Sequence, residues 1–389
     1  MSHRIIISIL FFVGIGYAQP DSTVHDIYDR PFVFQKENFA SFGGYFEANS
    51  NYVVEEGITE GLSFEARRFN IFFYSHISPM VRFFSELEFE HGTEEIALET
   101  AIVDLMLHPL FNFRVGVLLP PLGRFNVLHD SPKYNIIDRP LVSTKIIPST
   151  LMEVGKGFFG NKELSPTTEF GYELYFVNGL TDGILDNEDG ATRIASGKNE
   201  EMFEEDNNGT PSITGRLGFE SRLTGEVGLS FYKGVYNSFM MEGEVVDEKR
   251  FVQITALDFD KQFSRLTIQG ELAKAKIDIP ANLEEIFGSE QTGGYVDIGY
   301  TYRRGRLFSF DDLQMIATFR FDRVDLNVGK FGSTNTNIGD ETTRITVSNS
   351  FRPSEDTAFK MVYFYEWHKD LQDNLIRTGG WQFGVATYF

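Results

Sequence analysis

The stretch WQFGVATYF, residues 381–389, decides the fold that we predict for this chain. Its large apolar side chains, Trp381, Phe383 and Val385, are separated by single small or polar residues. Because successive side chains of a β-strand point to opposite faces, this period of two predicts a strand whose faces meet different surroundings. A strand at the surface of a water-soluble sheet would show the same pattern, so the prediction depends on the rest of the chain.

The same alternation recurs through the chain and is clearest in Val81–Glu90, where four of five residues on one face are apolar and four of five on the other are charged. This pattern is typical of a barrel strand that separates lipid from a wet lumen. The alternation is disturbed near Glu65–Arg68 and Phe251–Asp258, where we expect β-bulges. Segments of this kind predict sixteen strands, an even number as bacterial barrels require. They span residues 39–50, 63–77, 80–91, 95–107, 112–119, 152–160, 169–178, 211–221, 225–235, 249–259, 265–277, 293–303, 314–325, 341–351, 357–368 and 379–389.

The connections between these strands alternate in length. Every second connection is short, and most of the short ones carry turn-forming residues. The long connections are residues 120–151, 179–210, 236–248, 278–292 and 326–340. A soluble all-β protein has no reason to separate long from short connections in this way. The sequence therefore predicts an all-β fold, a transmembrane antiparallel β-barrel with short periplasmic turns and long extracellular loops.

The start of the chain is typical of a secretory signal peptide. An apolar run from Ile5 to Ile15 follows a basic residue and precedes a Gly-Tyr-Ala sequence that ends at residue 18. The predicted divisions are a signal peptide at 1–18, a periplasmic N-terminal lead at 19–38 and the barrel at 39–389.

The composition excludes several classes of protein. The net charge of −21 argues against nucleic acid as a partner. The absence of cysteine means that the fold relies on packing and hydrogen bonds alone. Aromatic residues make up 15% of the chain, yet no apolar run after residue 18 is long enough for a membrane-spanning helix. An exported, aromatic-rich chain of this kind favours the barrel.

The connection at residues 120–151 is unusually apolar for an extracellular loop. A loop with so many apolar side chains should fold onto another surface, and long ordered loops are commonly functional. Its charged residues are Arg124, Lys133, Arg139 and Lys145 against Asp130 and Asp138. The loop is therefore positive within an acidic chain, whereas the connection at residues 179–210 is strongly acidic and is predicted to be a solvated surface loop.

Three segments of the apolar loop resemble the third-loop signature of porin-type proteins from Bacteroidetes-like bacteria, which are usually grouped with the phosphate-selective porin O and P family. The segments are Pro121–Asn126, Asp138–Val142 and Ile146–Pro148. The resemblance implies a sixteen-stranded outer-membrane barrel, often trimeric, that passes small anions and is narrowed by its third loop. The final strand, which ends in Phe389, is also similar to the closing strand of outer-membrane barrels, where it serves as an assembly signal.

The predicted inner wall departs from the family pattern, in which arginines form a ladder along the path. The basic residues predicted to face inward are Arg82, Arg114, Arg216, Arg320, Arg344 and Lys360. The acidic ones are Glu47, Glu86, Glu88, Glu90, Glu173, Glu220, Glu271, Asp297 and Asp322. This mixture is not an anion ladder, so the resemblance supports a channel better than it supports phosphate.

These observations predict an outer-membrane porin of a Gram-negative bacterium, a passive diffusion channel for small hydrophilic solutes, including anions such as phosphate. The predicted pore constriction is Arg124, Lys133, Arg139, Lys145, His129 and Asp130. The predicted pore wall is Arg82, Glu86, Glu88, Glu90, Arg114, Arg216 and Arg320. Basic groups that face acidic ones across a pore would order water and ions. If the loop charges instead pair with the wall, they leave little field.

The predicted partners are outer-membrane lipid and lipopolysaccharide, and two further copies of the chain in a homotrimer. No cofactor and no metal site is predicted. Two other functions stay open. A barrel plugged by residues 120–151 could act as a scaffold or secretion partner. An outer-membrane hydrolase could use His129 as a base and Asp130 to orient it, although no nucleophile motif accompanies them.

Overall fold

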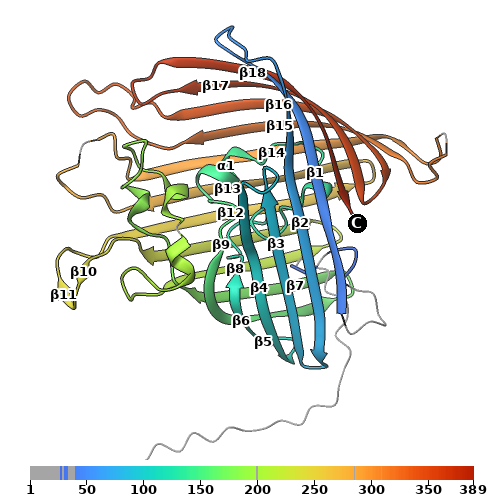
Figure 1. Cartoon of the computed structure of the whole chain (residues 1–389), viewed down its shortest axis with the longest axis horizontal. Coiled ribbons are helices and arrows are strands. Elements are labelled where there is room, and N and C mark those ends of the chain that lie inside the picture. Colours follow the sequence, from blue (N-terminus) through green and yellow to red (C-terminus); the bar gives the residue numbers. More distant parts are fainter. Residues whose placement is uncertain (1–26, 29, 34–39, 199, 284, 308) are drawn as a thin grey trace, which may run out of the picture.

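The computed structural model describes residues 27–28, 30–33, 40–198, 200–283, 285–307 and 309–389. Sixteen antiparallel strands in these residues form one closed barrel (Figure 1). The barrel strands are β1 (Ala40–Glu55), β2 (Leu62–Ser78), β3 (Val81–Glu90), β4 (Glu95–His108), β5 (Phe111–Leu118), β6 (Glu153–Ser165), β7 (Thr168–Val177), β8 (Ser212–Ser221), β9 (Gly225–Val235), β12 (Phe251–Phe263), β13 (Leu266–Ile277), β14 (Glu290–Arg304), β15 (Gln314–Asp325), β16 (Glu341–Ser354), β17 (Thr357–Lys369) and β18 (Leu375–Tyr388). The predicted signal peptide lies outside the described residues, as does most of the predicted lead.

Each of the sixteen predicted strands is present, and the closed barrel confirms the predicted fold class. Some strands are longer than predicted, since β1 continues to Glu55 and β6 to Ser165. The added residues are mostly polar, so the hydrophobic pattern does not mark them. A separate hairpin of β10 (Met240–Met241) and β11 (Glu244–Val245) forms in the connection after β9.

One of the two predicted bulges is present. In the segment Glu65–Arg68 the register of β1 and β2 shifts, and Arg67 is the extra residue. The bulge predicted at Phe251–Asp258 is wrong, because β12 keeps a regular register with both of its neighbours. Inward-facing residues of β12, such as Ile254, are apolar because they pack in the cluster inside the barrel, and this hides the alternation between faces.

The first and last strands close the barrel, and they lie side by side in Figure 1. Closure leaves no sheet edge whose N–H and C=O groups would need water inside a membrane. Beyond the ladder, the N–H of Gly44 donates to the carbonyl of Phe389 at 3.2 Å. A side chain at Gly44 would place its Cβ 2.1 Å from the carbonyl oxygen of Asn70 on β2 and 2.7 Å from the ring of Phe389, so the close packing on both sides of β1 requires glycine.

The outer face is apolar and the inner face is polar, as the alternation predicts. Trp381 and Phe383 are 42% and 48% exposed, whereas Gln382 between them is 5% exposed. In β15, Phe321 is exposed and the neighbouring Arg320 is buried. An apolar exterior around a polar interior is the arrangement of a transmembrane barrel.

Two segments occupy the interior. Residues 119–152, here called the inserted loop, run from β5 to β6 and include the short helices η1 (Ser131–Lys133) and α1 (Leu141–Lys145). Residues 27–28 and 30–33, here called the N-terminal segment, are also buried except for Pro31. Their apolar side chains join inward-facing wall residues in one cluster. Leu180, Ile184 and Ile194 of the connection after β7 are buried in the same cluster, so the prediction of a solvated surface loop at residues 179–210 is wrong for this part of it. Among the described residues, no helix is long and apolar enough to cross a membrane.

Cysteines at Ala48 and Val385 test the closure. These residues lie opposite each other on β1 and β18, and the spacing of opposite residues, roughly 4.5–5.5 Å between Cα atoms, suits a disulfide. Because the chain has no cysteine, oxidation should join this pair alone and give a covalently closed chain that migrates faster than the reduced chain after heating in detergent.

The control pair is Val54 and Val385, which lie six positions out of register on the same two strands. Their separation of roughly 20 Å should keep them reduced. A cross-link in the control pair, or none between Ala48 and Val385, would contradict the register of the seam.

Candidate functional site

The candidate site is the inserted loop together with the wall that it contacts. Nearly all of the loop is buried or half-buried, and Lys145 is its exposed residue. Leu122, Val142, Ile146 and Ile147 are fully buried. The unusual apolar content of this loop therefore has a physical reason, because the loop folds within the lumen and builds a small core there.

Acidic side chains of the wall accept hydrogen bonds from the inserted loop. The Glu271 carboxylate on β13 accepts the N–H of Phe125 at 2.5 Å and the hydroxyl of Ser143 at 2.7 Å. The Asp322 carboxylate on β15 accepts the N–H of Leu141 at 3.1 Å. A loop inside a barrel has no strand partner for its backbone, and these carboxylates satisfy donors that would otherwise be buried without a partner.

Basic side chains on the neighbouring strands satisfy the carbonyl groups of the same loop. Arg352 on β16 donates to the carbonyls of Pro132 at 2.8 Å and Tyr134 at 3.0 Å. Lys360 on β17 donates to the carbonyl of Ser131 at 2.8 Å. The inward charges on this part of the wall therefore hold the loop backbone.

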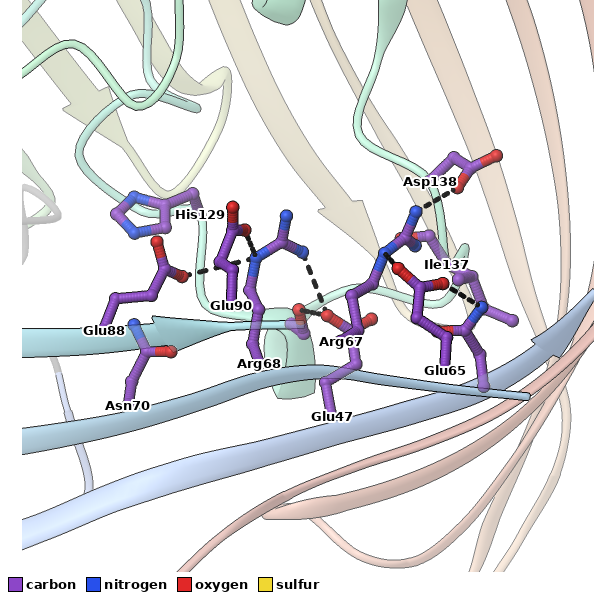
Figure 2. A network of polar contacts seen from close by, with 12 residues as sticks. Glu47, Glu65, Arg67, Arg68, Asn70, Glu88, Glu90, His129, Ile137 and Asp138 are labelled. Atoms are coloured by element: carbon purple, nitrogen blue, oxygen red, sulfur yellow. Dashed lines mark hydrogen bonds and ion pairs between the residues drawn. The ribbon is translucent and has the colours of Figure 1, made fainter. Parts of the chain in front are cut away.

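Asp138 joins the inserted loop to four strands. Its carboxylate accepts from Arg67 at 2.9 Å, Arg344 at 3.5 Å and Gln382 at 3.2 Å, and its carbonyl accepts from Arg320 at 2.8 Å. Burial alone would raise the pKa of Asp138, but the guanidinium groups of Arg67 and Arg344 outweigh it and hold the pKa below its ordinary value. Figure 2 shows Arg67 reaching from β2 to Asp138.

The acidic row of the wall is paired within the wall. Arg68 on β2 lies 3.0 Å from Glu47, 3.3 Å from Glu88 and 2.6 Å from Glu90. Figure 2 shows this guanidinium between the three carboxylates. The predicted partners of Glu88 and Glu90 are the basic residues of the loop. In the structure the wall residue Arg68 pairs with both carboxylates, and the charge of Arg139 in the loop also acts on Glu88.

A second buried group surrounds His129. Its Nε2 lies 3.1 Å from the carboxylate of Glu99, and its Nδ1 lies 3.1 Å from the carbonyl of Asn126. The Asn70 amide donates to Glu86 at 2.8 Å. The His129–Glu99 contact ties the middle of the inserted loop to β4, on the side of the barrel away from Glu271.

The N-terminal segment brings a buried arginine to the same place. Arg30 lies 2.8 Å from Asp130 and 3.5 Å from Glu86. Its guanidinium carbon lies 4.9 Å and 5.3 Å from the ring centres of Phe72 and Phe84, which is a cation–π arrangement. The prediction of a polar periplasmic lead is therefore wrong for these residues, since they lie inside the barrel.

Glu86, His129 and Asp130 place possible ligand atoms within 4.8 Å of one another. Three such groups could hold a metal ion. The Arg30 guanidinium already contacts both carboxylates of this group. The cation at this position is therefore a side chain of the protein itself, and His129 and Asp130 engage different partners rather than forming a base and its orienter.

The four predicted basic residues of the constriction lie in different surroundings. Arg124 lies 3.2 Å from Glu226 and 3.5 Å from Asp260, on β9 and β12, and not against Glu86, Glu88 or Glu90. Lys133 is half-buried near Asp130 and interacts with it electrostatically. Arg139 is half-buried with its Nε and Nη2 atoms free of hydrogen bonds. The structure thus separates these charges instead of grouping them.

The predicted wall arginines point inward and most are paired with carboxylates. Arg114 contacts Asp104 through two nitrogens, both at 2.8 Å. Arg320 contacts Asp297 at 2.6 Å and 2.7 Å, and Arg216 contacts Asp258 at 2.5 Å and Glu226 at 2.8 Å. Arg82 differs, because its guanidinium lies 5.9 Å from the ring centre of Tyr28 in the N-terminal segment.

A cavity of about 760 Å³ lies on the extracellular side of α1. It is bounded by the inserted loop, by the connection after β7 and by the extracellular ends of β15, β16 and β17. Its charged lining residues include Lys145, Arg193, Arg344, Asp340 and Glu366. Lys145, a predicted constriction residue, therefore faces an open space.

Sequence reasoning missed Arg30, Glu99 and Arg352. Arg352 lies just beyond a predicted strand, in a segment assigned to a turn. Tyr28, Arg30 and Phe32 alternate with other residues, and this period of two in the lead was the available signal for a segment that packs on a sheet.

No family model matches the chain. An uncharacterized protein of Aquifex aeolicus strain VF5 is 27% identical over 369 residues, which cover 88% of this chain and 79% of that protein. Among solved structures, the outer membrane channel DcaP of Acinetobacter baumannii aligns with a TM-score of 0.54 and 12% identity over 92% of this chain and 99% of its own. The trimer form of OmpT, an outer membrane protein of Vibrio cholerae, aligns with a TM-score of 0.51 and 10% identity over 90% of this chain and 100% of its own.

At such identities the structural likeness establishes the fold. The chain has the closed, sixteen-stranded antiparallel barrel of outer-membrane proteins.

Replacing Glu271 with alanine tests the attachment of the inserted loop. The change leaves the N–H of Phe125 and the hydroxyl of Ser143 buried without an acceptor, so the free energy of unfolding should fall by about 2–4 kcal/mol. Denaturant unfolding in lipid vesicles measures this. Gln269→Ala, on the same strand, is the control and should cost less, because Gln269 bonds only within the wall. Equal losses would show that Glu271 does not hold the loop.

Replacing Arg30 with methionine tests the N-terminal segment. Asp130 and Glu86 would stay buried without this guanidinium, so the variant should be less stable by about 3–5 kcal/mol. Arg30→Lys keeps the charge and should lose less. Thermal unfolding and protease cleavage within residues 27–33 provide the measurements. A methionine variant as stable and as resistant as the parent would contradict the burial of this segment.

Proposed function

We propose that this protein is an outer-membrane channel for passive diffusion of small hydrophilic solutes, with the inserted loop as its constriction. The observation that carries the proposal is a charged loop folded within a closed barrel, beside an open cavity of about 760 Å³ on its extracellular side. The apolar exterior and the likeness to outer-membrane barrels, which include the channel DcaP, support the location and the class.

The loop charge that a solute would meet is Lys145. Lys145 lines the cavity and is exposed. Arg139 is half-buried, its Nε and Nη2 atoms are buried without hydrogen bonds, and its charge acts on the carboxylates of Glu88 and Glu99. Arg124 is instead paired with two carboxylates, so its field is largely cancelled. Unpaired basic groups at a narrow point favour anions.

The finer parts of the proposal come from the sequence resemblance. Phosphate is one anion that the resemblance suggests, and the paired wall arginines give no ladder for it. A homotrimer in the outer membrane of a Gram-negative bacterium, exported by a signal peptide, belongs to the same proposal. The trimer form of a structural neighbour, OmpT of Vibrio cholerae, supports the trimer as a hypothesis.

A plugged barrel that serves as a scaffold or secretion partner is the second candidate. One observation favours it: the inserted loop is bonded to strands on opposite sides of the lumen, through Glu99 on β4, Glu271 on β13 and Lys360 on β17. The N-terminal segment adds further bulk in the same space. A loop held so widely could block passage rather than restrict it.

Single-channel conductance in a planar bilayer under a salt gradient separates the two candidates. A steady conductance is expected, with a reversal potential that indicates anion preference. The variant Lys145→Gln should shift the reversal potential toward cations, because a positive charge leaves the path. Arg306→Gln is the control, since Arg306 is 78% exposed in a turn outside the lumen, and it should change nothing.

A cation preference in the parent would exclude phosphate as the transported solute and would favour a porin without anion selectivity. No conductance from a folded barrel would reject the channel and favour the plugged scaffold. Copurifying protein partners would then be sought for that scaffold.

A further inference from the structure

The N-terminal segment lies inside the barrel, near the strand ends that short turns connect. The ring of Phe32 stands against Gly43, just after the start of β1 at Ala40, with the ring Cγ 2.5 Å from the place that a Cβ on Gly43 would take. Tyr28 packs edge-on against Tyr74, close to the end of β2, with 5.6 Å between the ring centres. Because the short turns of such a barrel face the periplasm, the segment occupies the periplasmic half of the lumen.

Side chains of the segment bridge the wall and the inserted loop. The hydroxyl of Tyr28 donates to the carboxylate of Asp104 on β4 at 2.6 Å. The guanidinium of Arg30 donates to the carboxylate of Asp130 in the inserted loop at 2.8 Å. The segment therefore fills space between β4 and the inserted loop, on the periplasmic side of the proposed constriction.

Residues 27–28 and 30–33 belong to no strand of the barrel. The backbone N–H of Arg30 donates to the carbonyl of Tyr28 at 2.8 Å, and that of Val33 to the carbonyl of Arg30 at 3.2 Å, so these bonds lie within the segment. β1 pairs with β18 and β2, and the barrel closes without any residue of the segment. The segment can therefore leave its place while every strand keeps its partners.

The polar contacts of the segment can be exchanged for water. The free energy of removing two charges from water largely offsets their attraction, so a buried ion pair such as Arg30–Asp130 holds weakly once water can reach it. Without the segment, Asp130 keeps the hydroxyl of Tyr388 at 2.7 Å, and Asp104 keeps the guanidinium of Arg114 at 2.8 Å. Both carboxylates therefore keep a partner after the segment has left.

We propose that the N-terminal segment is a removable plug, which fills the periplasmic half of the lumen in this structure and withdraws toward the periplasm while the barrel and the inserted loop stay in place. Val33 is seven positions before Ala40, at the periplasmic end of β1, so the chain itself keeps the plug close to its site. The role as a plug rests on the proposed channel, whereas the movement can be measured without conduction.

Thiol labelling of Val33→Cys in the full chain, folded in detergent, measures the movement. The chain has no cysteine, and Val33 is 3% exposed, so a water-soluble maleimide reaches this thiol only when the segment has left. The thiol should react slowly in the folded protein. Adding Arg30→Met should raise the labelling rate by about tenfold or more, the effect of one lost charged hydrogen bond, because the rate follows the population of the withdrawn state.

Val362→Cys is the matched control. Val362 is a buried valine on β17 that packs against Ile136 and Ile137 of the inserted loop. Neither the wall nor the loop moves in the proposal, so this thiol should stay unlabelled with and without Arg30→Met. Labelling of both thiols at one rate would show that the whole barrel opens and would overturn the proposal.

A disulfide between Phe32→Cys and Gly43→Cys should hold the plug in place. The Cβ of residue 32 is one bond beyond its Cγ, which puts the two Cβ atoms within about 4 Å, the spacing of a disulfide. In a planar bilayer the oxidised protein should keep one small conductance, and a reductant should add transitions to a larger one. The two states differ only in this bond, so each protein sample is its own control.

Two further results would overturn the proposal. The first is a Val33→Cys thiol as unreactive as Val362→Cys in both backgrounds, which would make the segment a fixed part of the core. The second is a conductance that the reductant does not change, which would show that the segment does not obstruct the path. No conductance in either state would instead count against the proposed channel, and the labelling rates would then decide the movement on their own.

Discussion

The backbone hydrogen-bond ladder between β1 and β18 is the constraint on which the rest of the structure depends. In a membrane no water can satisfy an open sheet edge, so the strands must close on themselves. In a closed barrel one face of each strand is outside and the other is inside. Alternate residues therefore face opposite ways, as Phe321 faces outward and Arg320 inward. Because the apolar membrane excludes charged side chains from the outer face, the charges lie together in the lumen, where each requires a partner.

The inserted loop meets much of this requirement. It has no strand partner for its own backbone, and the wall carries buried charges that need partners. Glu271 accepts its N–H groups, and Arg352 and Lys360 donate to its carbonyls. The same contacts explain why inward arginines do not form an anion ladder. Arg114 and Arg320 are each held by a carboxylate of the wall, so the charges that are free to act on a solute are few and lie on the extracellular side of the loop.

Most of the fold could be predicted because its signal is local. The alternation around Trp381 and Phe383 identifies the closing strand, and the same pattern finds the other fifteen. Prediction failed where the lumen is itself apolar. The inward face of β12 at Ile254 packs in the interior cluster, so both faces read as apolar and a bulge was inferred that is absent. Residues 19–38 are predicted to be a periplasmic lead because they are polar and show no sustained period, and the alternation of Tyr28, Arg30 and Phe32 is too short to indicate a packed segment.

The sequence by itself determined the number and order of the barrel strands and, where the two faces of a strand differ in polarity, the side chains that face inward. These follow from a period of two that each segment carries independently of the others. Only the tertiary structure decided which charges meet. Arg30 pairs with Asp130 at a separation of 100 positions, and Lys360 reaches Ser131 across 229. The closed shape of the barrel and the path of the loop within it determine such partners, because an ion pair depends on the distance between two charges in space. The periodicity of the sequence does not indicate that distance.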